Sequence, residues 1–317
     1  MTSRLTRRAL LPAAAAALAS CQKTAPIPFA GSSPVAILKA KSYQEDLVVH
    51  ILDGIRLCGL HVKDKRVVLK PNLVEFDAAT AINTDVALVA AALTAFRSLG
   101  AASVTIAEGP GHRRDTLGLA DEAGYGKTIK NFEDNFVDLN RDDVSPIKNF
   151  AGLDQFFFPN TALAADLIVS MPKMKTHHWA GATLSMKNFF GLVPGAIYGW
   201  PKNTLHYIGI AESIVAINRQ FRQTFAIVDG IVGMEGNGPI QGTPKKAGVL
   251  VFGKDLVAVD ATCCRIMGID PAKVEYLNMA TDLGALHPPQ ILQRGENPTA
   301  VRTNFQLIEQ YHSLRLA

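Results

Sequence analysis

Short apolar runs alternate with segments of helical periodicity along most of the chain. Runs typical of buried strands lie at residues 35–40, 66–69, 103–109, 166–171, 224–228 and 248–252. Apolar residues at helical spacing predict helices over residues 43–60, 85–99, 206–219, 256–267 and 271–282. This alternation predicts an α/β fold, with a parallel or mixed sheet that is covered by helices on both faces.

The middle of the chain, residues 124–159, follows this pattern less regularly. The stretches FVDLN and QFFFP indicate short strands around a polar connection. We interpret this region as either an inserted lobe or an antiparallel extension of the sheet. The glycine- and proline-rich stretch 231–244 indicates a tight loop after the strand at 224–228.

The first 21 residues have the pattern of a targeting signal rather than of a folded domain. Arg7 and Arg8 precede an apolar stretch, residues 13–19, that is shorter than the roughly 20 residues needed to span a bilayer. This order is typical of an export signal, and a twin-arginine pair indicates passage through the twin-arginine export machinery. The sequence LASC, which ends at Cys21, resembles a bacterial lipobox, in which the cysteine is lipidated; the alternative is a plain secretory signal.

These patterns predict the organisation of the whole chain. Residues 1–21 form the export signal and lipobox, residues 22–33 form a tether, and residues 34–317 form a single α/β domain. We therefore expect an exported protein that a lipid on Cys21 anchors to the membrane on its periplasmic side.

Composition excludes two classes of protein. The chain has 32 basic and 28 acidic residues, and three of the basic ones (Arg4, Arg7 and Arg8) belong to the signal, which leaves 29 against 28. This balance leaves no electrostatic footprint for nucleic acid, so no nucleic-acid partner is expected. The chain has no C-x-x-C motif, so we expect no iron–sulfur cluster, and Cys263 and Cys264 are interpreted as core residues.

Polar side chains follow several of the predicted strands, at the point where each strand ends. They are Lys70 and Asn72; Glu108 and His112; Lys173, Lys175, His177 and His178; and Asp229 and Glu235. Because the carboxyl ends of parallel strands share one edge of a sheet, the loops after them converge. The sequence therefore predicts one pocket, with ammonium groups facing carboxylates across it.

The segment 170–195 has the highest density of candidate functional side chains in the sequence. By their i, i+2 spacing, Lys173, Lys175 and His177 share one strand face or none of them does. We also expect one of the two lysines to point into the cleft and the other to solvent. His177 is a candidate metal ligand, although two consecutive histidines chelate poorly. Lys187 and Asn188 lie in a predicted short helix between Gly181 and Gly191, which would let the backbone approach a phosphate or carboxylate.

Three acids complete the set of candidates. Asp229 ends a strand and Glu235 lies in the glycine-rich loop, so both are candidate ligands of a divalent cation or acid–base groups. Asp260 lies in an apolar helix, where a carboxylate needs a partner. The sequence leaves open whether Asp260 serves structure, by pairing or capping, or function.

Six motifs occur in a fixed order from residue 69 to residue 271: LKPNL, EGPG, PKMKTH, MKNFFGLVPG, VDGIVGMEGNGP and AVDATCCRIMGIDP. Together they resemble the DUF362 family, whose biochemical role is largely unassigned, over residues 35–284. Many members resemble iron–sulfur proteins because they carry appended ferredoxin-type cysteines, which this chain lacks. The segment GATLSMKNFFGLVPG is also similar to a glycine- and lysine-bearing region of nickel-pincer lactate racemases.

We therefore expect an exported, lipid-anchored enzyme acting on a small anion that bears a phosphate or carboxylate, with a divalent metal as an optional cofactor. The alternative is a non-catalytic lipoprotein that binds an anion or a metal complex. Candidate catalytic residues are Lys187, Asp229 and Glu235. Candidate ligand-binding residues are Lys70, Asn72, Glu108, Lys173, Lys175 and Asn188, and candidate metal ligands are His177, Asp229 and Glu235.

Overall fold

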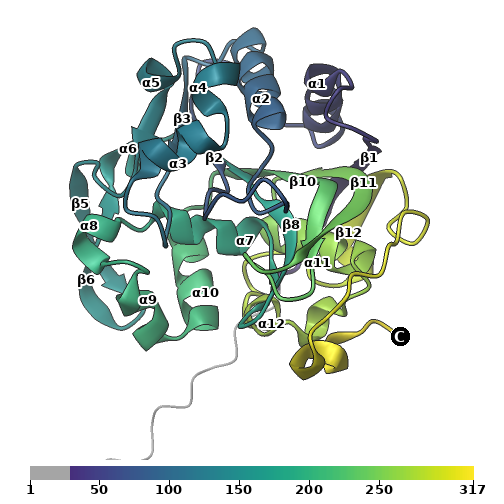
Figure 1. Ribbon diagram of the computed structural model, residues 1–317. Helices are drawn as coiled ribbons and strands as arrows, with labels where there is room; N and C mark the ends of the chain where they lie inside the picture. The colour runs from purple at the N-terminus through teal and green to yellow at the C-terminus, as the bar shows by residue number, and fades with distance from the viewer. Residues whose placement is uncertain (1–28) are drawn as a thin grey trace, which may run out of the picture.

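The computed structural model describes residues 29–317 (Figure 1). The predicted export signal, Cys21 and most of the predicted tether lie outside the described residues. Within residues 29–317, none of the helices has both the length and the apolar character required to span a bilayer.

A ten-stranded sheet forms the centre of the fold. Its strands are β1 (Ser33–Lys39), β2 (Arg66–Pro71), β3 (Ser103–Glu108), β4 (Phe136–Asp138), β7 (Leu167–Met171), β8 (Lys173–His177), β9 (Gly181–Thr183), β10 (Thr224–Glu235), β11 (Thr243–Gly253) and β12 (Ile291–Gly295). Eight of them follow the order β12-β1-β11-β10-β7-β2-β3-β4, while β8 pairs with β10 and β9. Along this order, β11 is antiparallel to both neighbours and the other pairs are parallel, which confirms the prediction of a mixed sheet.

Helices cover both faces of this sheet, as the alternation of elements predicted (Figure 1). The longer ones are α1 (Leu47–Leu57), α2 (Val86–Ser98), α3 (Thr116–Glu122), α10 (Ile210–Gln220) and α11 (Leu256–Ile266). Side chains alternate across β2: Val67 and Leu69 belong to the apolar layer that includes α1 and α2, whereas Val68 belongs to the layer that includes α10 and α11. The core is thus divided into two apolar layers, one on each face.

Short helices connect these elements. They are α4 (Tyr125–Thr128), α5 (Phe132–Asn135), α6 (Asn160–Leu163), α7 (Ser185–Asn188), α8 (Gly195–Tyr198), α9 (Asn203–Ile208) and α12 (Glu275–Met279), with 3-10 turns at Phe189–Leu192, Pro271–Lys273, Pro288–Gln290 and Glu309–Leu314. The predicted helix at 206–219 is two helices, because Gly209 adopts φ 109 between α9 and α10. The predicted helix at 271–282 is likewise only a 3-10 turn followed by α12.

The irregular middle of the chain forms a separate two-stranded antiparallel sheet of β5 (Val144–Phe150) and β6 (Leu153–Pro159). Its aromatic side chains stack on one another and on Tyr198, whose ring lies 4.2 Å from that of Phe156.

The stretch 231–244 is not the tight loop that its glycines predicted, because β10 continues to Glu235. Crowding within the sheet requires two glycines of this strand. A Cβ on Gly230 would lie 2.9 Å from the Val249 carbonyl oxygen, and one on Gly233 would collide with the Met174 carbonyl oxygen.

Candidate functional site

The loops that follow β2, β3 and β8 meet at one cavity of about 630 Å³. This is the carboxyl edge of the parallel strands, where open α/β sheets place their ligands. Residues predicted from the sequence that line the cavity are Lys70, Asn72, Glu108, His112, Lys175, His177, His178, Lys187 and Asn188. The structure thus brings together most of the candidate residues, as the convergence of strand ends predicted.

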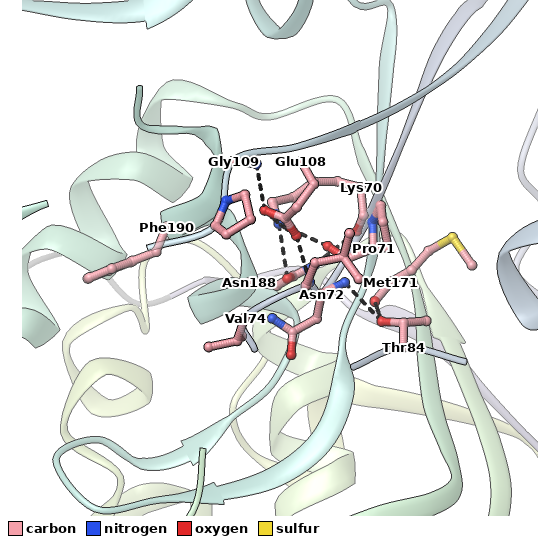
Figure 2. Close-up of polar contacts among 12 residues, drawn as sticks. Lys70, Pro71, Asn72, Val74, Thr84, Glu108, Gly109, Met171, Asn188 and Phe190 are labelled. Atoms are coloured by element: carbon pink, nitrogen blue, oxygen red, sulfur yellow. Dashed lines mark hydrogen bonds and ion pairs between the residues drawn. The ribbon is translucent and has the colours of Figure 1, made fainter. Parts of the chain in front are cut away.

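Lys70 and Glu108 form a buried ion pair on one wall of the cavity (Figure 2). The Lys70 ammonium lies 2.8 and 2.7 Å from the two Glu108 oxygens and also donates to the Pro71 carbonyl and to Asn188 Oδ1. Glu108 accepts two further hydrogen bonds, from the backbone N–H groups of Leu73 and Gly109. With four acceptors around three N–H groups, Lys70 has no proton to spare for a ligand.

Gly191 packs directly against this pair. A Cβ at this position would collide with Glu108 Oε1 and with the Lys70 ammonium. The glycine therefore allows the backbone of the MKNFFG motif to close over the ion pair, whereas the sequence had suggested approach to a phosphate.

Lys187 lies on α7, half-buried, and contributes to the cavity lining. Among residues 29–317 its ammonium has neither a hydrogen bond nor an ion pair, and its contact is the ring of Phe190, 4.7 Å from Nζ to the centroid. Burial lowers the pKa of Lys187 to about 8. This lysine keeps all three donors for whatever enters the cavity.

Two further lysines direct part of their hydrogen-bonding capacity to backbone carbonyls. Lys175 donates to Ile82 O and Pro239 O at 2.8 and 3.3 Å. Lys202 donates to Gly109 O and Phe190 O at 2.6 and 2.9 Å. Burial lowers the pKa of both groups, that of Lys202 to about 7, and each ammonium retains a third proton.

The cavity thus has three lysines that no carboxylate neutralises. Glu108 is the single carboxylate among the described residues that line it, and Lys70 neutralises that carboxylate. Lys175, Lys187 and Lys202 therefore have no carboxylate opposite them, which favours the entry of an anion.

The two adjacent histidines have opposite hydrogen-bonding roles. His177 Nδ1 accepts from the backbone N–H groups of Trp179 and Ala180, at 2.9 and 3.1 Å, so its proton is on Nε2. His178 Nδ1 lies 2.8 Å from the Gly238 carbonyl oxygen, so Nδ1 carries a proton and, in the neutral ring, Nε2 carries a lone pair. The rings stack 4.9 Å apart, and burial followed by the charge of Lys187 lowers the pKa of His177.

Asp229 and Glu235 are not part of this cavity. Asp229 is fully buried and accepts from Lys173 Nζ at 2.6 Å, from Tyr43 OH at 2.9 Å and from the Asp85 N–H at the start of α2. Glu235 pairs with Lys245 at 3.3 Å and accepts from the Gln306 N–H. Both carboxylates therefore neutralise a local lysine, and neither faces the ammonium groups of the cavity as the sequence had suggested.

The predicted metal set of His177, Asp229 and Glu235 is correspondingly dispersed. Within residues 29–317, no three His, Cys, Asp or Glu side chains lie together in a way that would hold a metal ion. His177 is also unsuited as a ligand in this arrangement, because freeing Nε2 would place a proton on Nδ1 and break both backbone hydrogen bonds.

Lys173 and Lys175 differ from the expectation that one would face solvent, because both are buried. Lys173 lies opposite Asp229 on β10 and binds it, whereas Lys175 lies opposite Met234, beyond a register irregularity of β10. Pairing across strands, which the spacing along one strand does not reveal, decides where each ammonium goes.

Asp260, whose role the sequence left open, caps a short helix. Its two oxygens accept the N–H groups of Ser185 and Met186 at 2.7 and 3.0 Å, at the first turn of α7. Burial raises the pKa of Asp260 to about 7. The carboxylate therefore positions the helix that carries Lys187.

Sequence reasoning missed Lys202 and undervalued His206. Lys202 lies between α8 and α9 in a left-handed conformation, φ 68, with its side chain buried in the cavity wall. His206 lies on α9, where the sequence pattern indicated only the start of a helix; burial and the charge of Lys187 lower its pKa. Neither residue follows a strand, so the rule that found the other candidates could not find these two.

Comparisons with known proteins relate this sequence to one family. A family model described as "Domain of unknown function (DUF362)" matches residues 67–265, more than half of the chain. A thylakoid-associated protein of Synechocystis sp. is 31% identical over 151 residues, which cover 46% of this chain and 43% of that protein. The aligned part thus spans less than half the length of that relative.

Among solved structures, the lactate racemase apoprotein from Thermoanaerobacterium thermosaccharolyticum matches with a TM-score of 0.49 and 14% identity. The match covers 76% of this chain and 58% of that chain.

Proposed function

The chain belongs to the DUF362 family, and on the geometry of its cavity we propose that it is an enzyme that acts on a small anion bearing a carboxylate or phosphate. From the pattern of residues 1–21 we further propose that it is exported and lipid-anchored. The observation that carries the proposal is the excess of lysines over carboxylates: Lys175, Lys187 and Lys202 line a cavity whose single carboxylate among the described residues is bound to Lys70. Lys187 would be the principal anion-binding group, with Lys175 and Lys202 each donating one further proton.

The histidine pair favours an enzyme over the alternative of a non-catalytic binding protein. His177 presents an N–H donor and His178 a lone pair from adjacent positions. A donor and an acceptor beside one bound anion are what general acid–base chemistry requires. A carrier that only holds an anion has no use for the lone pair of His178, which repels anionic oxygens.

Anion binding can be tested by calorimetric titration with inorganic phosphate and with acetate, at constant ionic strength maintained with chloride. We expect Lys187→Gln to weaken binding by about tenfold to a hundredfold, because a hydrogen bond from a charged donor contributes about 1.5–3 kcal/mol. Lys127→Gln is the matched control, since Lys127 is exposed on α4 and outside the cavity. The proposal fails if neither anion binds more tightly than chloride, or if Lys187→Gln binds like the wild type while remaining folded.

Turnover separates the two functional candidates once an anion is found. Tight binding without conversion, across a panel of hydroxy, oxo and phosphorylated acids, would select the binding protein. The proposal assigns no step to a divalent metal, because the predicted ligands His177, Asp229 and Glu235 lie apart and each is engaged elsewhere.

The proposal of export and lipid anchoring rests on Arg7, Arg8 and Cys21. We expect native protein to fractionate with membranes and Cys21→Ser to release it, because the acyl chains on the cysteine would provide the anchor. Mass spectrometry of the native protein supplies the independent check: an unmodified Cys21, or a Cys21→Ser variant that stays in the membrane fraction, would contradict lipidation.

A further inference from the structure

Lys187 differs from every other lysine that lines the cavity. Lys70 is saturated by four acceptors, and Lys175 and Lys202 each donate to two backbone carbonyls. Lys187 has no such acceptor among residues 29–317. Anion binding would be served equally well by a lysine held by a carbonyl, so the lack of any acceptor calls for a separate explanation.

The position of Lys187 is nevertheless fixed at both ends of its helix. Asp260 accepts the first two N–H groups of α7, and Asn188 at its last residue binds Lys70 O and Ser170 Oγ at 3.0 and 3.1 Å. The ammonium of Lys187 lies over the ring of Phe190. An amine on a rigid support with no internal partner is what a lysine nucleophile needs.

We propose that Lys187 is a covalent nucleophile, which forms an imine with the carbonyl carbon of a small anion such as a 2-oxo carboxylate or a phosphorylated aldehyde or ketone. This inference rests on the proposed function: the Lys187 ammonium would bind the incoming anion and, once it has lost a proton, would leave the anionic group to Lys175 and Lys202. It also narrows the substrate class to anions that carry a ketone or aldehyde.

The step balances without any further reactant. The neutral amine of Lys187 adds to the carbonyl carbon, a C–N bond forms, the carbonyl π electrons move to the oxygen, and one proton passes from the nitrogen to that oxygen to give a carbinolamine. The nitrogen then loses a proton, the hydroxyl leaves as water, and a C=N bond remains. His206, whose pKa is lowered by burial and by the nearby charge of Lys187, lines the same cavity and can carry the proton to the leaving hydroxyl.

Burial makes the required amine available near neutral pH. With a pKa of about 8, roughly one tenth of Lys187 is unprotonated at pH 7, against less than about one thousandth for a lysine in water.

Reductive trapping tests the proposal on the folded wild-type protein. The protein is incubated with cyanoborohydride and one of two probes: pyruvate, which is a 2-oxo carboxylate, or glycolaldehyde phosphate, which is a phosphorylated aldehyde. The modified lysines are then located by peptide mass mapping. We expect a single reduced adduct on Lys187 with at least one probe, and the probe that reacts identifies the anionic group. No adduct, or adducts distributed over exposed lysines such as Lys127 and Lys130, would overturn the proposal.

Two measurements on the wild-type protein separate this inference from the proposed function. Calorimetry with phosphate or acetate reports the anion site, and trapping reports the imine; Lys187→Arg, which forms no imine, should give no adduct. Wild type that binds those anions but is never trapped would refute the imine and leave the anion site standing. Wild type that neither binds nor is trapped would refute both. Because the mapping is done on wild type, a variant that fails to fold does not decide the question.

Discussion

Removal of Lys70 tests whether its pair with Glu108 builds the wall of the cavity or binds the ligand. Both side chains are about 1% exposed, and the pair joins β2, β3 and α7 through Asn188. Lys70→Met keeps most of the side-chain volume and leaves Glu108 with only the two backbone donors of Leu73 and Gly109. Breaking a buried pair in this way costs about 3–5 kcal/mol, because an uncompensated charge stays behind.

The double variant Lys70→Met with Glu108→Gln supplies the internal control. The amide oxygen introduced by Glu108→Gln can accept from one backbone N–H without carrying a charge, so the larger part of the lost stability should return. Replacing a buried ion pair as a unit is often close to neutral, whereas removing one partner is not. Urea unfolding followed by circular dichroism gives the free energies of unfolding of wild type, both single variants and the double variant.

A Lys70→Met protein that is as stable as wild type but has lost phosphate and acetate binding would refute a structural role for the ion pair. That result would return Lys70 to the ligand-binding role that the sequence suggested. A large loss of stability that the double variant does not recover would equally contradict charge burial as the cause, and would indicate lost packing instead.

Two further predictions concern the support of α7 and the closure over the ion pair. In wild type, folding raises the pKa of the Asp260 carboxyl from 3.8 to about 7, so the folded state binds an extra proton, and this group's contribution to stability falls by about 3 kcal/mol as pH rises from 4 to 7. In Asp260→Asn this dependence of stability on pH should vanish, which urea unfolding at several pH values would measure. Parallel plots of unfolding free energy against pH for the two proteins would contradict the prediction. Gly191→Ala should lower the free energy of unfolding by about 1–3 kcal/mol, because its methyl group would collide with Glu108 and Lys70. Gly111→Ala is the control and should change the free energy of unfolding little, since its Cβ would meet nothing within 4 Å. Equal melting temperatures for the two variants would refute the close packing at Gly191.

The sequence predicted those features that depend on local pattern. Apolar runs and helical periodicity placed β2, β3, β7, α2 and α11, and Asp85 and Asp255 cap the two helices at their predicted starts. The convergence of the loops at one edge followed from parallel strands alone. These inferences needed no knowledge of which side chains meet.

Partner choice could not be predicted in the same way. Lys70 binds a carboxylate 38 positions away, and Lys173 binds one 56 positions away. Nothing in the spacing of Lys173 and Lys175 shows that the first pairs with Asp229 while the second reaches the cavity. The long β10 was missed for a related reason, since the glycines that signalled a turn are there because Met174 and Val249 leave no room for a Cβ.

The charged groups of this protein thus fall into two sets with different consequences. Lys70 with Glu108 and Lys173 with Asp229 are buried pairs, which add little net stability but cannot be broken singly, so they fix the loops that carry them. Lys187 has no partner among residues 29–317, yet it lies on a one-turn helix held by Asp260 at its start and by Asn188 at its end. A helix of one turn has no stability of its own, so the position of the Lys187 amine depends on those two contacts. Changes at Asp260 or Glu108 should therefore alter the chemistry of Lys187, although neither carboxylate is free to bind the ligand.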